Sequence, residues 1–170
     1  NNGTLSALNG GTLLLNSNVT AGALGQIVAG AGSTVLQNGV TLSGTVNTSG
    51  SGSFRASGSG VNFLDGVTLN GNLDMASAFS LQRVKAGGLV LNGTIDIANQ
   101  SALSFEGDGG LTGNATVVLG SLGGATNRIA LDGIGTTTFA AGTTVRGHTG
   151  TIGNALNIGG TQTLINNGTI

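Results

Sequence analysis

Residues 88–98 read GLVLNGTIDIA, and two earlier segments repeat this wording closely. Residues 66–76 read GVTLNGNLDMA, and residues 39–49 read GVTLSGTVNTS. All three contain the motif Leu-x-Gly-x-φ-x-φ, in which φ is usually apolar, and residues 111–117 carry a weaker copy. A repeat of about 20–27 residues indicates a solenoid, in which successive copies stack on one another. The leading leucines that set this spacing are Leu42, Leu69, Leu91 and Leu111.

The repeated unit has the periodicity of a β-strand. Within residues 89–97 most apolar residues lie two positions apart and polar residues stand between them, as in a strand with one buried face. Val, Ile and Thr are plentiful, whereas the helix formers Glu, Lys and Arg are scarce. The glycine of each motif falls on the buried side, which is best explained by a bend from one sheet to the next. These glycines are Gly44, Gly71, Gly93 and Gly113.

We therefore predict an all-β fold, a parallel β-helix (β-solenoid) with about 20–27 residues in each turn, or rung, formed by residues 1–170 as a single segment. Neighbouring rungs bury their apolar faces together, so equivalent side chains should form ladders along the axis. A leucine-rich repeat would need a second consensus leucine spacing, which is missing. A β-sandwich or barrel stays an alternative. The predicted ladders are Leu42 over Leu69 over Leu91, and Val46 over Leu73 over Ile95.

Composition excludes several classes of function. Charged residues make up 6% of the chain, against about 25% in a typical soluble protein, and the net charge is −1. The chain has no basic patch for a phosphate backbone, so we expect no nucleic-acid partner. It has no run of about 18 apolar residues, so we expect no membrane-spanning segment. Cysteine is absent, which excludes disulfides and thiolate metal sites.

Residues capable of catalysis are few. His148 is the only histidine, and no Gly-x-Ser-x-Gly motif accompanies it. Glu106 and Asp108 could form an acid–base pair of the glycosidase kind, but a glycine-rich turn with two acids is more often only a turn. We therefore interpret the chain as not an enzyme and expect no catalytic, cofactor-binding or metal-binding residue and no cofactor.

Two further interpretations concern outer and inner positions. Asp74 and Asp96 should lie one rung apart on the outer surface, where their repulsion is eased by solvent and by nearby Arg83 or Lys85. A cation bound between the two carboxylates is the alternative. Four of the five phenylalanines fall at inward or strand positions and are interpreted as core residues: Phe54, Phe63, Phe79 and Phe105.

Short phrases of the chain resemble the β-helical stalks of filamentous-haemagglutinin-like adhesins and of autotransporter passengers, which are bacterial surface proteins. The phrases are NNGTL (1–5), LNGT (91–94), TGTIGN (149–154) and LINNGTI (164–170). The resemblance implies a right-handed β-helix that is secreted to the extracellular space or the bacterial cell surface and serves reach, scaffolding or adhesion. The irregular rung length departs from that pattern, and the secretion and translocator domains of those proteins are missing.

The expected function is that of a non-enzymatic structural protein, an extracellular fibre or adhesin stalk. The chain begins NNGTL and finishes NNGTI, which predicts either association end to end into filaments or continuation in a longer solenoid. The alternative is a ligand-binding surface for a host or cell-surface glycan or for ice, with a polysaccharide-acting enzyme ranked after it. Ice binding would need Thr-x-Thr on successive rungs in register, and residues 136–138 and 161–163 are the threonine-rich candidates.

Overall fold

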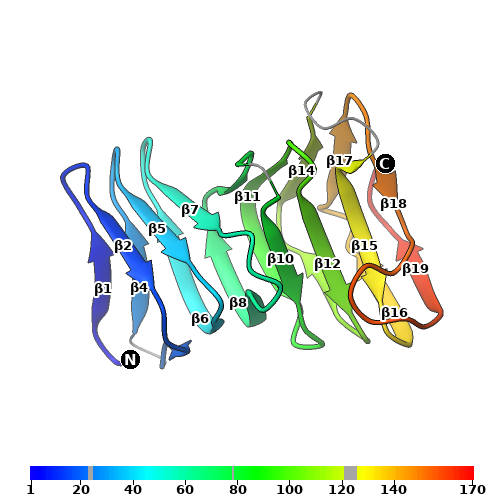
Figure 1. Cartoon of the computed structure of the whole chain (residues 1–170), viewed down its shortest axis with the longest axis horizontal. Helices are drawn as coiled ribbons and strands as arrows, with labels where there is room; N and C mark the ends of the chain where they lie inside the picture. The colour runs from blue at the N-terminus through cyan, green and yellow to red at the C-terminus, as the bar shows by residue number, and fades with distance from the viewer. Residues whose placement is uncertain (23–24, 78, 121–125) are drawn as a thin grey trace.

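The computed structural model describes residues 1–22, 25–77, 79–120 and 126–170. These residues form an all-β solenoid whose parallel strands follow one another along the long axis (Figure 1). The prediction of a β-solenoid is therefore confirmed. The strands are β1 (Thr4–Ala7), β2 (Thr12–Leu15), β3 (Val19–Thr20), β4 (Gln26–Ala29), β5 (Thr34–Gln37), β6 (Thr41–Thr48), β7 (Ser53–Ala56), β8 (Phe63–Asn70), β9 (Leu73–Met75), β10 (Leu81–Val84), β11 (Leu89–Ile97), β12 (Ala102–Glu106), β13 (Gly110–Thr112), β14 (Ala115–Leu119), β15 (Arg128–Asp132), β16 (Gly135–Phe139), β17 (Thr144–Gly147), β18 (Thr151–Ile152) and β19 (Gln162–Asn166).

Strand pairing divides the solenoid wall into three faces, and the long strands β6, β8 and β11 each cross a corner and belong to two of them. Face I consists of β1, β4, the second halves of β6 and β8, the first half of β11, β13, β16 and β19. Face II consists of β2, β5, β7, β9, the second half of β11, β14 and β17. Face III consists of β3, the first halves of β6 and β8, β10, β12, β15 and β18.

Rung length varies slightly more than the leucine spacing predicts. Thr34 pairs with Ser53 across a short rung, whereas Gly110 pairs with Thr138 across a much longer one. The long rungs contain residues 120–127, which connect β14 to β15, whereas the equivalent connection from β11 to β12 is residues 98–101. Most of the extra residues therefore stand between strands in the sequence, and the paired strands on either side keep their register.

The predicted ladders are right for two copies of the motif and wrong for the first. Leu69 pairs with Leu91 on face I, and Leu73 pairs with Ile95 on face II. Leu42, however, pairs with Leu64 on face III, and Val46 pairs with Leu69. The first copy bends from face III to face I, whereas the copies at Leu69 and Leu91 bend from face I to face II. The motif therefore marks a corner without specifying which corner it is.

The motif glycines lie at these corners, as predicted. Gly44 has a φ of 93° and stands where the register between β6 and β8 shifts. A Cβ atom on Gly93 would lie 2.0 Å from the Gly71 carbonyl oxygen of the preceding rung. Rungs approach each other so closely at this corner that a side chain would collide with backbone.

The core is a continuous column of fully buried apolar side chains inside the three faces. Each large side chain buried in this way stabilises the fold by about 1.5–3 kcal/mol. The column includes Ile27, Val46, Leu69 and Leu91 from face I, Val35, Phe54, Leu73 and Ile95 from face II, and Leu42, Leu64, Val84 and Phe105 from face III.

Two of the four phenylalanine assignments are wrong. Phe54 and Phe105 are fully buried as predicted, and the ring of Phe105 meets that of Phe139 edge-on at 5.5 Å. Phe63 instead lies on the outer side of face III, because the inward position of that strand is occupied by its neighbour Leu64. Phe79 is 61% exposed, because it stands in the connection between β9 and β10 with a φ of 58°, a turn conformation that directs it to solvent.

A ladder of side-chain amides runs along the outer side of face I. Asn47 Nδ2 donates to Gln26 Oε1 at 2.8 Å, and Asn70 Nδ2 donates to Asn47 Oδ1 at 3.0 Å. Asn92 Nδ2 then donates to Asn70 Oδ1 at 2.8 Å. Each of these bonds contributes about 0.5–1.5 kcal/mol, so the outer surface also ties the rungs together.

Candidate functional site

The charged residues of this chain are concentrated on the outer side of face III. The chain has 11 of them, 5 basic and 6 acidic, and more than half lie on or directly after strands of this face. Because side chains alternate along a strand, the strand neighbours of these charged residues point into the core. The charged residues of face III are Asp65, Arg83, Lys85, Glu106, Arg128 and Asp132.

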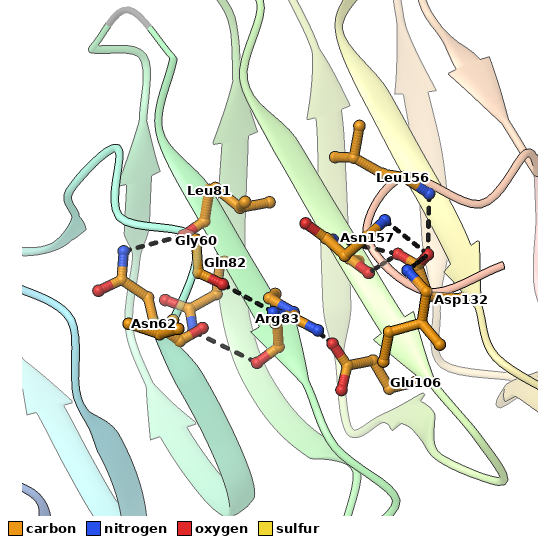
Figure 2. Close-up of polar contacts among 12 residues, drawn as sticks. Gly60, Asn62, Leu81, Gln82, Arg83, Glu106, Asp132, Leu156 and Asn157 are labelled. Carbon is orange, nitrogen blue, oxygen red and sulfur yellow. Dashed lines mark hydrogen bonds and ion pairs between the residues drawn. The ribbon is translucent and has the colours of Figure 1, made fainter.

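Arg83 is the centre of a cluster of interactions on this face. Its Nε donates to Glu106 Oε1, and its Nη1 donates to the Gly60 carbonyl oxygen at 2.7 Å (Figure 2). The Arg83 and Glu106 side chains are only 12% and 13% exposed. Charge-assisted bonds of this kind are stronger than neutral ones, and here they order two neighbouring strands and the turn at Gly60.

The aromatic ring of Phe63 receives two cations. Arg83 pairs with Phe63 in strand register, and its guanidinium carbon lies 4.6 Å from the ring centroid. Lys85 Nζ lies 4.5 Å from the same centroid. Cation–π attraction favours both positions, which explains why a phenylalanine is stable on the outer side of the wall.

Asp132, at the end of β15, is fully buried beneath residues 153–161, the connection from β18 to β19. Its Oδ1 accepts hydrogen bonds from the backbone amides of Leu156, Asn157 and Ile158, each at 2.8 Å (Figure 2). Its Oδ2 accepts bonds from Ser104 Oγ and from Asn157 Nδ2. Burial by itself raises the pKa of Asp132, but these hydrogen bonds outweigh it, so the pKa lies below its ordinary value of 3.8.

A hollow of about 260 Å³ lies beside this connection. It is lined by residues of β15, of the connection and of the start of β19, among them Leu131, Asn154 and Gln162. Gln162 Nε2 also donates to the backbone carbonyls of Gly107 and Asp132. The connection is therefore fixed to the wall in its middle, through Asp132, and directly after its end, through Gln162.

His148 takes part in neither of the clusters around Arg83 and Asp132. His148 is exposed after β17, and its Nδ1 is hydrogen-bonded to the hydroxyl of its neighbour Thr149 at 2.8 Å. It borders a hollow of about 270 Å³ that is also lined by Leu119, Val145 and Ile170. The arrangement is that of an outer-surface residue.

Glu106 and Asp108 do not act as a pair. Glu106 binds Arg83 on face III, whereas Asp108 lies in the turn before β13 and its Oδ1 accepts the Thr136 amide at 2.8 Å. Each carboxylate thus stabilises a different contact between rungs. A hollow of about 270 Å³ next to Asp108 is lined by residues of two successive corners and of nearby strands, among them the glycines at 87–88 and 109–110.

Asp74 and Asp96 do lie one rung apart, as predicted, and they pair in register on face II. The cation that eases their repulsion is not the predicted one. Arg55 Nε lies 3.1 Å from Asp74 Oδ2, whereas Arg83 and Lys85 belong to face III. Burial and then the Asp74 carboxylate raise the pKa of Asp96 above its ordinary value of 3.8, and Arg146 lowers it.

Replacing Asp96 should therefore stabilise the protein at neutral pH. A raised pKa in the folded state means that the ionised carboxylate is disfavoured there, and the penalty disappears as pH falls below the ordinary pKa of 3.8. We expect Asp96→Asn to gain about 0.5 kcal/mol in unfolding free energy near pH 7 and nothing near pH 3, measured by urea denaturation.

The matched control is Asp74→Asn, which removes the same repulsion but also removes the ion pair with Arg55 and weakens the charge-assisted bond from the Ala76 amide. Asp74→Asn should therefore not show the gain in unfolding free energy that we expect for Asp96→Asn near pH 7. If Ca²⁺ stabilises the parent protein and fails to stabilise Asp96→Asn, a cation binds between Asp74 and Asp96. The interpretation of the two carboxylates as a simple repulsive pair would then be wrong.

Sequence reasoning missed the two interaction centres of face III, Arg83 with Phe63 and Asp132 with residues 153–161. The signal for the first was present, because Phe63 and Arg83 are separated by one repeat length and so occupy equivalent positions of successive rungs. Asp132 stands in Leu-Asp-Gly, which resembles any turn. The residues that bind it carry no motif.

Parallel rungs, a closed apolar core and outer ladders define the class of protein, a β-solenoid repeat protein. No protein-family model, curated protein or solved structure matches this chain. Within residues 1–22, 25–77, 79–120 and 126–170, no helix has the length and apolar character needed to cross a membrane. The same residues contain no group of three or more His, Cys, Asp or Glu side chains that could hold a metal ion.

Proposed function

We propose that this chain is a non-enzymatic structural protein, a segment of an extracellular fibre or of an adhesin stalk on a bacterial surface. The observation that carries the proposal is the continuity of the packing. On every face, core side chains of one rung pack on those of the next, so the chain makes a rod whose length grows with the number of rungs. A rod of this kind is suited to reach and scaffolding.

The outer surface supports the same role. The amide ladder from Gln26 to Asn92 and the Arg83–Glu106 pair each join neighbouring rungs outside the core. The chain offers trypsin only 5 Lys and Arg residues, and the Arg83 side chain is only 12% exposed. Resistance to local unfolding and to proteases is what an extracellular stalk requires.

Negative-stain electron microscopy over a series of protein concentrations tests this proposal. We expect rods of the width of one solenoid that lengthen as concentration rises, because the rung edges can pair end to end. Rods of one constant length at every concentration would contradict end-to-end association, and the stalk would then need a longer chain. Compact particles with no long axis would contradict the structural role itself.

A glycan-binding surface is the second candidate, because face II carries a row of hydroxyl groups. One outward hydroxyl per rung lies in register on most rungs of this face, and uncharged hydroxyls suit the hydroxyls of a neutral glycan. The row consists of Thr12, Thr34, Ser53, Thr94, Thr116 and Thr144. A glycan array that retains the parent protein and loses the double variant Thr94→Val, Thr116→Val would favour this candidate.

Ice binding has weaker support. Thr136 pairs with Thr163, but Thr138 pairs with Ile165, so the Thr-x-Thr of β16 is not repeated in register on β19. The row next to the hydroxyls on face II includes Arg55, Asp74 and Asp96. Charged side chains interrupt the flat threonine array that this role needs.

A further inference from the structure

One carboxylate fastens residues 153–161, which we call the strap, to the outer side of face III. Three consecutive strap amides, those of Leu156, Asn157 and Ile158, converge on Asp132 Oδ1 at 2.8 Å (Figure 2). Asn157 Nδ2 reaches Oδ2 at 3.2 Å, and Ser104 Oγ donates to the same oxygen from β12. Consecutive amides arranged in this way form a binding site for an anion, and Asp132 supplies that anion.

All five bonds require Asp132 to accept. An ionised carboxylate is an acceptor only, whereas a protonated one carries an O–H donor on one of its oxygens. A hydrogen on Oδ2 can be accepted by Ser104 Oγ, since a hydroxyl accepts as well as donates, but it then faces Asn157 Nδ2, and the three amides at Oδ1 meet a neutral oxygen in place of a charged one. The strap is thus held more strongly by the ionised form than by the protonated form.

No other charge in the surroundings takes over this role. The strap, GNALNIGGT, contains no Asp, Glu, Lys, Arg or His. From β16 and β19 the facing groups are uncharged, and they include Thr137 and Gln162. On β12, Glu106 pairs in register with Asp132, but its carboxylate is bound by Arg83 from β10.

Two further charges lie near this end of face III. Asp108, in the turn after β12, is bound to the Thr136 amide. Arg128 stands at the opposite end of β15 from Asp132. Asp132 forms no ion pair within the part of the chain that the structure describes.

We propose that Asp132 is an acid-released latch: its ionised carboxylate clamps the strap over the end of β15, and protonation frees the strap. Release exposes Ser104 and Asp132, which are fully buried in the clamped form. Release also changes an apolar surface, which is formed by the exposed side chains of Leu156 and Ile158 on the strap and of Ile134 on the wall. The strap and the wall are joined there by the Gly133 amide, which donates to the Ile158 carbonyl at 3.1 Å. Acid would therefore rearrange a contact surface on the rod while the core ladders stay closed.

The pH range of release follows from the direction of the pKa. Because the pKa of Asp132 in the folded protein lies below its ordinary value of 3.8, the latch contributes its full stability above that value. The contribution is lost as pH falls through the lower, folded-state value. The strap should stay clamped at neutral and weakly acidic pH and open only in strong acid.

Nuclear magnetic resonance of the labelled, full 170-residue chain from about pH 6 to about pH 2 tests the latch. We expect the Asp132 carboxyl carbon and the amide protons of Leu156, Asn157 and Ile158 to shift together with one midpoint below 3.8. Amides of β11 in the rod interior should keep their positions over the same range. Strap amides that do not shift, or that follow Glu106 or Asp108 instead of Asp132, would overturn the proposal.

Variants separate the latch from general acid effects. In Asp132→Asn at neutral pH we expect hydrogen exchange of the three strap amides to rise by about tenfold or more, with little change in β11. If that variant fails to fold, Ser104→Ala provides the decisive measurement, because removing this donor should raise the release midpoint. The matched control is Asp108→Asn, which removes another amide-bound carboxylate and should leave the midpoint where it is. An unchanged midpoint in Ser104→Ala, or a shifted one in Asp108→Asn, would contradict the latch.

Discussion

The substitution Ile95→Asp should unfold the middle of the solenoid. Ile95 is fully buried on face II, and it pairs with Leu73 of one neighbouring rung and Val117 of the other. The change removes about 1.5–3 kcal/mol of apolar burial and places a carboxylate without a partner in the core. We expect a loss of more than about 4 kcal/mol in unfolding free energy, measured by thermal and urea denaturation.

Val90→Asp on the same strand is the matched control. Val90 is 38% exposed and lies on the outer side of face I, between Thr68 and Thr112. A carboxylate there meets solvent, so the loss should stay within about 1 kcal/mol. If Ile95→Asp melted within about a degree of the parent protein, Ile95 would not face the core and the register of β11 with its neighbours would be wrong.

How far the sequence predicts the fold is clear from the motif glycines. Alternation and repeat length were enough to predict a parallel solenoid, because each rung must match the next in shape. The glycine of the motif correctly marked a corner in every copy. It could not tell the corner between faces III and I from the corner between faces I and II, since both require the same close approach of backbone. The Leu42 ladder was wrong for this reason.

Outer positions were harder to predict than the core. Most inward residues are apolar, with Gln37 and Gln82 as exceptions, whereas an outward residue is only required to tolerate solvent. The partner of an outward residue therefore depends on the register of several rungs at once. Arg83 was expected near Asp74 and binds Glu106 of the next rung instead. Phe63 was interpreted as a core residue from its inward or strand position in the sequence, but it lies outside, where the cations Arg83 and Lys85 stabilise it.

The contacts of Asp132 with the strap could not be predicted from the sequence for a related reason. Its strap departs from the repeat, and its donors are backbone amides, which any sequence provides. Nothing in GNALNIGGT distinguishes three amides that converge on a carboxylate from an ordinary glycine-rich turn. Residues that break a repeat are therefore the ones whose role only the structure can show, and in this chain they surround a buried carboxylate with donors on both of its oxygens.

Gly93→Ala should be nearly as damaging as a charge in the core, although it adds one methyl group. The new Cβ would lie 2.0 Å from the Gly71 carbonyl oxygen and 2.6 Å from its carbonyl carbon. Gly71 cannot move aside easily, because its amide donates to the Asn92 carbonyl at 3.0 Å. Gly93 has no positive φ, so the loss is purely steric, and we expect about 3 kcal/mol or more, at the upper end of the range for overpacking.

The matched control for this corner is Gly60→Ala. A Cβ on Gly60 would have open space around it, Gly60 likewise has no positive φ, and its carbonyl would still accept from Arg83. We expect a change between none and a gain of about 1 kcal/mol, because alanine restricts the unfolded chain. A large difference in melting temperature between the two variants would mean that corner glycines set the distance between rungs. Equal melting temperatures would mean that the rungs can separate at the corner, and the close approach of Gly93 to Gly71 would then not be needed for the fold.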